Sequence, residues 1–274
     1  MDAKLDDKFE ERPFWLNFPD SDPTDKEMHE LLMRLMRGVN ARSFSQLGNR
    51  VVIGPFAGMT IPSRMTSWDD GNSGTKLLGV YEQELHAAFD HAMWRRPEIL
   101  VNVGCAEGYY AVGFLRRHPG LKVIGIDVLP EALSLCDEYA ALNGVRDRLE
   151  LRHGCESPEE LRFSDDKRHR LYIIDVEGEE DHLIDLNKCP EMIHSDIIVE
   201  CHDFIKSDLS CRISDRLSAT HRVTLILPKM PDLDQFQFMR SYPTIMSVLV
   251  AVEKRPMPCC WLACWANTKG TSNG

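Results

Sequence analysis

The segment Ile99-Leu-Val-Asn-Val-Gly-Cys-Ala-Glu-Gly-Tyr-Tyr110 decides the fold of this chain. Its first five residues, 99–103, predict a short buried strand, and Gly104 lets the chain turn sharply where that strand ends. Gly108 allows the backbone to approach a ligand closely at the start of a helix that we expect to run to His118. A strand, a glycine turn and a helix in this order open a sheet that binds a ligand at its strand ends.

Apolar runs and helix-like segments alternate downstream of this unit. Further strands are expected at 123–126, 149–152, 171–174, 197–199 and 223–227, and a closing pair at Val248–Glu253 and Trp261–Ala266. A helix is expected over 130–143, because Pro130 suits the first helical turn and Gly144 the stop. This alternation predicts an α/β fold whose sheet is mostly parallel and covered by helices on both faces.

The residues that precede the first strand follow another pattern. Asp25–Arg37 carries the apolar spacing of an amphipathic helix, and residues 51–79 have the Gly and Pro content of a long loop. Another helix is expected over Tyr81–Arg96. We therefore divide the chain into residues 1–80, an arm, helix and loop that would form a substrate cap or an oligomer contact, and a sheet domain over residues 81–274.

Composition limits the class of protein. The 274 residues carry a net charge of −11, and a surface this acidic repels polyphosphate, which argues against a nucleic-acid partner. The N-terminus lacks the basic and apolar parts of a signal peptide, and no apolar run reaches membrane-spanning length. Nine cysteines without a CxxC pair fit reduced thiols. A cytoplasmic protein without a membrane partner is expected.

The end of the second strand indicates what the glycine turn would bind. Asp127 lies 23 residues after Gly104, where a carboxylate can accept hydrogen bonds from the vicinal hydroxyls of a ribose. A dinucleotide fingerprint would need glycine at positions where this chain has Ala106 and Tyr109, and the Gly-Lys-Ser/Thr of a P-loop is missing. The pattern favours an adenosine-containing cofactor without a pyrophosphate, such as S-adenosylmethionine. An ordinary strand–helix turn and a nicotinamide-dependent reductase are the alternatives.

Several segments resemble class I S-adenosylmethionine-dependent methyltransferases. They are Val-Gly-Cys-Ala-Glu-Gly-Tyr-Tyr110, Gly-Ile-Asp127, Ile-Asp-Val-Glu-Gly-Glu-Glu180 and Val-Glu-Cys-His202, with a lead-in over Lys76–Leu85. The Asp-Val-Glu-Gly-x-Glu and Glu-x-His pieces are most similar to the FkbM-like branch, whose members are often O-methyltransferases. The resemblance covers about residues 76–266 and implies the Rossmann-like class I methyltransferase fold, with a mostly parallel seven-stranded sheet.

The resemblance also implies which residues surround the cofactor. The turn and the second strand end would supply Gly104, Cys105, Ala106, Glu107, Gly108, Tyr109, Asp127 and Val128. The adenine would lie beside Gly154, Cys155 and Glu156, the methionine end beneath Tyr81 and Glu82, and Asp175 completes the set.

Methyl transfer from a sulfonium requires the acceptor atom to be held in line with the methyl group, and a hydroxyl acceptor must also lose its proton. Asp175 and Glu200 end the fourth and fifth strands, which are neighbours in this topology, so they are expected to converge with His202. His202 could be a general base that a carboxylate orients. Alternatively, Asp175, Glu200 and His202 could bind Mg, Mn, Fe or Zn. In a third interpretation these groups are structural, with Glu177 and Glu180 complementing a helix N-terminus.

The sequence thus predicts an S-adenosylmethionine-dependent methyltransferase, with O-methylation of a small-molecule hydroxyl, of a natural product or sugar, as its activity. N-methylation of a small molecule is the main alternative, and a non-catalytic Rossmann-like binding module is the alternative of another class. The expected partners are the small-molecule acceptor and, through the N-terminal arm, a second copy of the chain.

Overall fold

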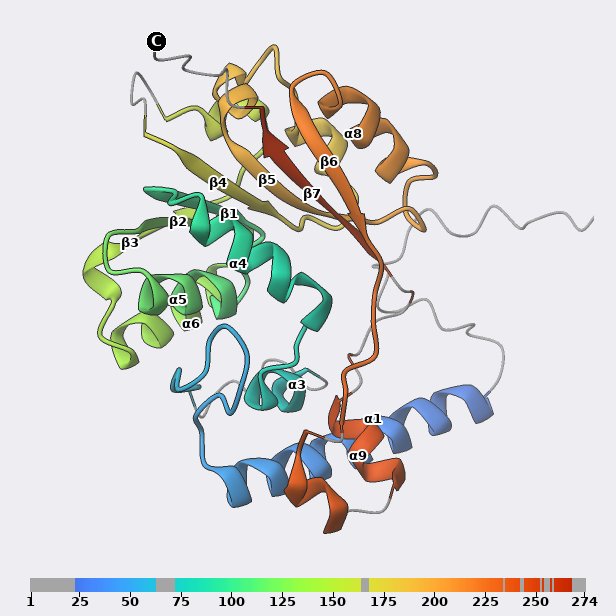
Figure 1. Cartoon of the computed structure of the whole chain (residues 1–274). Coiled ribbons are helices and arrows are strands. Elements are labelled where there is room, and N and C mark those ends of the chain that lie inside the picture. The colour runs from blue at the N-terminus through green and yellow to red at the C-terminus, as the bar shows by residue number, and fades with distance from the viewer. Residues whose placement is uncertain are drawn as a thin grey trace, which may run out of the picture.

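The computed structural model describes residues 23–62, 72–163, 168–233, 235–241, 244–251, 253, 257 and 259–267. Within these residues one seven-stranded sheet has the order β3-β2-β1-β4-β5-β7-β6 (Figure 1). Its strands are β1 (Ile99–Val103), β2 (Lys122–Asp127), β3 (Leu149–His153), β4 (Arg170–Ile174), β5 (Asp196–Cys201), β6 (His221–Ile226) and β7 (Cys260–Ala266). Neighbouring strands from β1 to β5 pair in parallel, and β7 is antiparallel to β5 and β6. The predicted fold class is confirmed.

Helices cover both faces of this sheet, which is why its central strands are apolar on both sides. Every residue of β1, β4 and β5 is buried, as parallel sheets of this kind require. Leu100 packs in one core cluster, whereas Ile99 and Val101 belong to the cluster on the other face. The first cluster includes side chains of α4 (His86–Trp94), α5 (Tyr109–Arg117) and α6 (Pro130–Leu142). The second includes side chains of α7 (Glu180–Leu183) and α8 (Leu209–Leu217).

Three further helices pack together beside the sheet and are called the cap helices below (Figure 1). They are α1 (Pro23–Leu47), α3 (Ser73–Leu78) and α9 (Thr244–Ala251). Met33 and Met36 of α1 form one small core with Leu249 of α9, and Val250 packs near Leu78 of α3 in another. The chain after β6 therefore returns to the N-terminal helices, and the predicted division at residue 80 stays a prediction.

The remaining helical elements are single turns. They are η2 (Gln83–Leu85), η3 (Arg146–Arg148), η4 (Pro158–Leu161), η5 (Pro190–His194) and η6 (Gln237–Ser241). Among the described residues, no helix has the length and apolar character needed to cross a membrane. All nine cysteines belong to the described part of the chain and are free thiols, as predicted.

Three of the predicted elements need correction. The expected strand Val248–Glu253 is wrong, because residues 248–251 belong to α9. An apolar run this short has no decisive period, and here its residues pack on a helix and not in a sheet. The helix expected over Tyr81–Arg96 begins only at His86 after a 3-10 turn, since Glu82 has a φ of 47°. The helix expected over Asp25–Arg37 continues to Leu47.

The long loop predicted at residues 51–79 is also only partly correct. It contains α3, and Arg50 pairs with Thr60 in an isolated antiparallel bridge. Residues 1–22 of the predicted arm and residues 63–71 of this loop lie outside the described residues.

Candidate functional site

The glycine turn after β1 has no room for side chains at its two glycines. Gly104 has a φ of 74°, and a Cβ there would lie 1.7 Å from the backbone oxygen of Asp175. Gly108 has a φ of 96°, and its Cβ would lie 2.5 Å from the sulfur of Cys136. The turn therefore packs tightly between the end of β4 and α6, which explains why the sequence has glycine at both positions.

Asp127, at the end of β2, holds this turn in place. Its Oδ2 accepts a hydrogen bond from the N–H of Ala106 at 2.8 Å, and its Oδ1 accepts one from Leu129 at 2.9 Å. The N–H of Gly154 donates to the backbone oxygen of Asp127 at 2.8 Å, and a Cβ at Gly154 would meet open space. Each carboxylate oxygen keeps a second lone pair, so Asp127 can still accept from ribose hydroxyls.

Strained backbone gathers at the same place. Within the described residues, five non-glycine residues have positive φ. Two of them, Glu82 and Ala106, are predicted cofactor residues, and a third, Glu177, lies two residues after Asp175. Their φ values are 47°, 46° and 53°. Such conformations cost about 1–3 kcal/mol each and cluster at ligand sites. The turn, its carboxylate partner and this strain fit the predicted S-adenosylmethionine, and the residues present offer what its ribose and backbone contacts need.

A buried ion pair that sequence reasoning missed ties the cap helices to the turn. Nζ of Lys76, on α3, lies 2.6 Å from Oε1 of Glu107, and both side chains are almost fully buried. The same Nζ lies 4.7 Å from the ring centroid of Tyr81. The hydroxyl of Tyr109 donates to the backbone oxygen of Lys76 at 3.3 Å. The only signal in the sequence was the position of Lys76 at the start of the Lys76–Leu85 lead-in.

Tyr109 lies inward and not toward open solvent. Its ring makes an edge contact with Phe56 at 5.4 Å and is buried in the core, and burial raises the pKa of its phenol far above the ordinary value. Cys105 is likewise buried, and a hydrogen bond with Cys136, together with burial, raises the pKa of its thiol. Because the side chains of Tyr109 and Cys105 are buried in the core, we expect both residues to contact the cofactor through their backbone.

The other predicted cofactor residues have varied surroundings. Glu82 is buried, and its N–H donates to Oε1 of Glu253 at 2.7 Å. Val128 is 66% exposed beside Asp127. Cys155 is half-buried, and burial raises the pKa of its thiol to about 11, whereas Glu156 is exposed. Contact of these residues with a cofactor stays a prediction.

The predicted catalytic residues come together around the imidazole of His202. Its Nε2 lies 3.3 Å from Oε2 of Glu177 and 3.7 Å from both Oδ1 of Asp175 and Oε2 of Glu200. Its Nδ1 lies 2.6 Å from Oε1 of Glu180. The convergence expected from the neighbouring ends of β4 and β5 is thus present in the structure.

Glu180 fixes the orientation of this imidazole. Its side chain is fully buried, and Oε1 also accepts hydrogen bonds from the N–H groups of Val176 and Gly178 at 3.3 and 3.1 Å. Because a carboxylate accepts, Nδ1 of His202 carries the proton and Nε2 faces the other acidic side chains. Glu180 therefore positions His202 and binds the backbone that precedes α7, and the role at a helix N-terminus that the third interpretation assigned to it stays a prediction.

Negative charge dominates this cluster. Burial alone would lower the pKa of His202, but the hydrogen bond with Glu180 and the charges of Glu200, Glu180 and Glu177 raise it above its ordinary value. Burial and the neighbouring charges of Glu200, Glu82 and Glu177 raise the pKa of Asp175 well above its usual range. A group of carboxylates so close together favours any bound cation.

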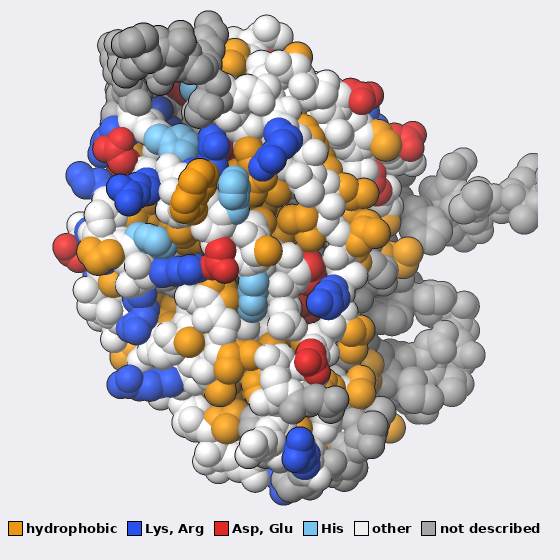
Figure 2. Space-filling view, in the orientation of Figure 1, with side chains coloured by type: hydrophobic (Ala, Val, Ile, Leu, Met, Phe, Trp, Pro, Cys, Tyr) orange, Lys and Arg blue, Asp and Glu red, His pale blue; other side chains and the backbone are white. Residues whose placement is uncertain are grey.

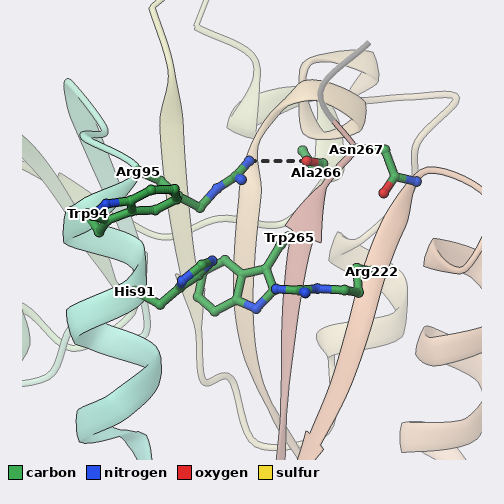
Figure 3. A pocket seen from close by; sticks show the side chains of 7 residues that line it. All are labelled: His91, Trp94, Arg95, Arg222, Trp265, Ala266 and Asn267. Atoms are coloured by element: carbon green, nitrogen blue, oxygen red, sulfur yellow. Dashed lines mark hydrogen bonds between the residues drawn. The ribbon is translucent and has the colours of Figure 1, made fainter. Parts of the chain in front are cut away.

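A separate hollow of about 340 Å³ is lined by residues of α4, β6 and β7 (Figure 3). It lies near the amino end of β5, whereas the glycine turn lies at the carboxyl ends of the parallel strands. Figure 2, in the orientation of Figure 1, shows basic and histidine side chains scattered over the face that contains α4. His91 meets Trp265 edge-on at 4.5 Å, and Arg95 donates to Asp196 at 2.7 Å and to the oxygen of Ala266 at 3.1 Å. Since Arg95 is engaged by these structural contacts, the hollow does not compete with the glycine turn as the candidate site.

No protein-family model matches the chain. The ribosomal protein L11 methyltransferase of Shigella sonnei is 38% identical over 65 residues, which are 24% of this chain and 22% of the relative. The chain thus covers about a fifth of the length of the curated relatives that it matches. The FkbM-like branch is not confirmed by these comparisons.

Solved structures with a similar fold include methyltransferases. An S-adenosylmethionine-dependent O-methyltransferase from Thermotoga maritima is 10% identical with a TM-score of 0.44, and the match covers 70% of this chain and 68% of that one. An rRNA methylase from Streptococcus thermophilus is 15% identical with a TM-score of 0.45, and the match covers 67% and 96%.

The predicted small-molecule acceptor is contradicted by the sequence matches, whose names give a ribosomal protein as the acceptor of those enzymes. The reason for the error is physical. The glycine turn and Asp127 hold a cofactor and carry no information on the size of the acceptor. The net charge of −11, from which nucleic acid was excluded, describes the whole surface and not the face that an acceptor meets.

Proposed function

We propose that this chain is an S-adenosylmethionine-dependent methyltransferase that modifies a macromolecule, specifically a polypeptide. One observation carries the activity: the Gly104–Gly108 turn is hydrogen-bonded to the Asp127 carboxylate at the carboxyl ends of β1 and β2. In open α/β sheets this is where ligands bind. Membership in the FkbM-like branch, which the Asp-Val-Glu-Gly-x-Glu and Glu-x-His motifs suggested, is part of this proposal.

In this proposal the turn and Asp127 hold the cofactor, which supplies an electrophilic methyl group on a positively charged sulfur. The backbone of the turn lines the cofactor, and Asp127 accepts hydrogen bonds from its ribose. In the same proposal the carboxyl groups of Asp175 and Glu200, at the ends of β4 and β5, would face the methionine end of the cofactor. The chain contributes mainly by positioning, because an in-line displacement depends on the alignment of its reacting atoms.

The acceptor atom that best suits the carboxylate cluster is an amine. A polypeptide amine is an ammonium ion in water, so it must lose a proton before its lone pair can attack the methyl carbon and the sulfonium can leave as a neutral thioether. Asp175 or Glu177, which both lie beside Nε2 of His202, would accept that proton. The choice of a polypeptide over RNA rests on the names of the sequence matches, which are methyltransferases of a ribosomal protein. The predicted O-methylation would also need a group that removes a hydroxyl proton, and His202 as general base would have to do so.

Two measurements test the proposal. Calorimetry should show that S-adenosylmethionine binds the wild-type chain, and that Asp127→Asn weakens binding about tenfold, which corresponds to one charge-assisted hydrogen bond. The protein is then incubated with methyl-labelled cofactor and, separately, with ribosomal proteins and with ribosomal RNA. Label in the protein fraction supports the proposal, and label only in RNA would replace polypeptide by RNA. Cofactor binding without label in either fraction would overturn the macromolecular acceptor.

A further inference from the structure

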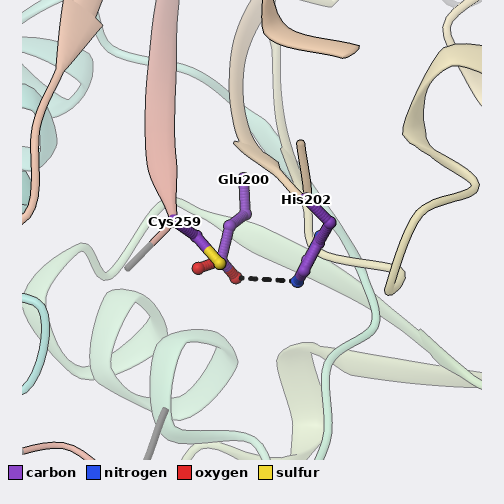
Figure 4. A group of neighbouring side chains, drawn as sticks. All are labelled: Glu200, His202 and Cys259. Carbon is purple, nitrogen blue, oxygen red and sulfur yellow. Dashed lines mark ion pairs between the residues drawn. The ribbon is translucent and has the colours of Figure 1, made fainter. Parts of the chain in front are cut away.

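Glu200, His202 and Cys259 form a second grouping within the acidic cluster, and it contains a thiol (Figure 4). All three residues are buried, and one ligand atom from each lies within 4.8 Å of the other two. Sequence reasoning had grouped Glu200 and His202 with Asp175 and had not included Cys259 in that group.

Strand pairing fixes the relative positions of these three residues. β5 and β7 are antiparallel, and in their register Glu200 lies opposite Trp261 and Cys201 opposite Cys260. Cys259 directly precedes β7 and therefore lies beside the end of β5. Glu200 is near that end of β5, and His202 is the first residue after it. Because the backbone positions are set by the sheet, little conformational entropy is lost when the three side chains bind one ion.

The imidazole already has the orientation that a metal ligand needs. Nδ1 of His202 is held by Glu180 at 2.6 Å, while Nε2 faces Oε2 of Glu200 at 3.7 Å. A histidine ligand almost always donates its other ring N–H to a carboxylate or carbonyl in this way. Glu180, which is held in turn by the N–H groups of Val176 and Gly178, would be that outer partner.

We propose that Glu200, His202 and Cys259 bind a zinc ion, whose fourth coordination position lies on the side of Asp175 and Glu177. A donor set of thiolate, imidazole and carboxylate suits zinc and does not suit magnesium or calcium. Bonds of ~2.0–2.3 Å in a tetrahedral site place ligand atoms roughly 3.3–3.6 Å apart. The 3.7 Å between Nε2 and Oε2 is close to this spacing.

A second set of possible ligands is less suitable. Asp175, Glu177 and His202 also lie within 4.8 Å of one another, but the Glu177 side chain is 54% exposed. This set offers no sulfur, so it has no preference for zinc over the more abundant magnesium. Both sets use Nε2 of His202, and only one can be occupied at a time.

The open position gives the ion a role, which rests on the proposed function. A site with three protein ligands keeps its fourth position for water or for an acceptor atom. Here that position would lie beside Asp175, close to the end of the glycine turn against which Asp175 packs. A neutral nitrogen or sulfur of the acceptor could bind there while the cofactor lies in the turn.

Zinc content and cobalt substitution test the site without any assay of activity. The full chain, purified and dialysed against metal-free buffer, should retain about one zinc ion per chain by mass spectrometry. Cobalt in place of zinc should give the thiolate-to-cobalt charge-transfer absorption of a tetrahedral site. Cys259→Ser should abolish this absorption, and Glu180→Gln should weaken zinc binding about 10–100-fold. Cys264→Ala, which changes a buried cysteine within β7, is the matched control and should bind zinc normally.

Three results would overturn the site. They are a chain that holds no zinc, a wild-type cobalt complex without thiolate absorption, and folded Cys259→Ser that binds zinc as well as the wild type. Loss of zinc in Asp175→Asn and Glu177→Gln but not in Cys259→Ser would assign the ion to the other set. Calorimetry with S-adenosylmethionine on the same samples separates the zinc site from the proposed methyltransferase function. A chain that holds zinc but does not bind the cofactor would refute only the function, and a chain that binds the cofactor but holds no zinc would refute only the zinc site.

Discussion

The buried ion pair of Lys76 and Glu107 leads to a prediction of definite size. Nζ and Oε1 lie 2.6 Å apart, and the side chains are only 6% and 3% exposed. Removing one partner of such a pair leaves the other charge buried without compensation, which costs about 3–5 kcal/mol. Lys76→Met should therefore lower the free energy of unfolding by that amount. Lys76→Met combined with Glu107→Gln should cost much less, since neither charge is left buried.

Urea unfolding of the wild type, both single variants and the double variant measures this coupling. With an m value of about 3 kcal/mol/M, a loss of 3 kcal/mol lowers the urea midpoint by roughly 1 M. The coupling energy, which is the sum of the two single losses minus the loss in the double variant, should exceed about 3 kcal/mol, the upper end of the range usually seen for residues in contact. Arg117→Met is a suitable control, because its ion pair with Asp90 lies at the surface, and it should cost less than about 1 kcal/mol.

Two results would refute this reasoning. If each single variant costs less than 1 kcal/mol, the pair does not hold α3 on the turn. If the losses are large but additive in the double variant, the two side chains stabilise the fold independently. Calorimetry adds a second readout, since Lys76→Met should also weaken the binding of S-adenosylmethionine through the displaced turn.

Three more predictions concern the turn, its carboxylate and a buried histidine. Gly104→Ala places a Cβ 1.7 Å from the backbone oxygen of Asp175 and should abolish cofactor binding by calorimetry, or folding by circular dichroism. Asp127→Ala removes the acceptor for the Ala106 N–H and should lower the thermal midpoint as well as the cofactor affinity; an unchanged midpoint would contradict this role. Burial lowers the pKa of His221 below its ordinary 6.5, so its stabilising contribution is present above that pH and is lost as the pH falls. His221→Gln should therefore show a smaller drop in urea midpoint than the wild type between about pH 7 and pH 5.

The parts of the fold that could be predicted depend on short-range sequence patterns. The strand that ends at Val103 was identifiable because an apolar run is followed directly by Gly104, and glycine can adopt the positive φ that this turn has in the structure. The convergence of Asp175, Glu200 and His202 followed from one topological rule, that neighbouring parallel strands end at the same edge. No comparison tests the chemical roles assigned to these three residues, and those roles stay predictions.

The parts that could not be predicted depend on contacts between distant segments. Lys76 and Glu107 are 31 residues apart, and Glu253 reaches Glu82 across 171 residues. No local pattern records such pairs. The helix α9 was missed for a related reason, since its apolar residues satisfy a strand as well as a helix until the partner α1 is known.

These distant contacts have a consequence for the way the site is assembled. Lys76 is bound to Glu107 of the turn, and the N–H of Glu82 is bound to Glu253, which follows α9. The segment from Lys76 to Glu82 is thus held at one end by the sheet and at the other by the chain between β6 and β7. Because a polar contact fixes each end of this segment, we expect a displacement of α9 to shift Tyr81 and Glu82. These two residues are the ones predicted to close over the methionine end of the cofactor. Buried or half-buried polar contacts therefore connect the cap helices with the glycine turn, and if the cofactor binds as proposed, we expect an acceptor that contacts the cap helices to influence the cofactor site.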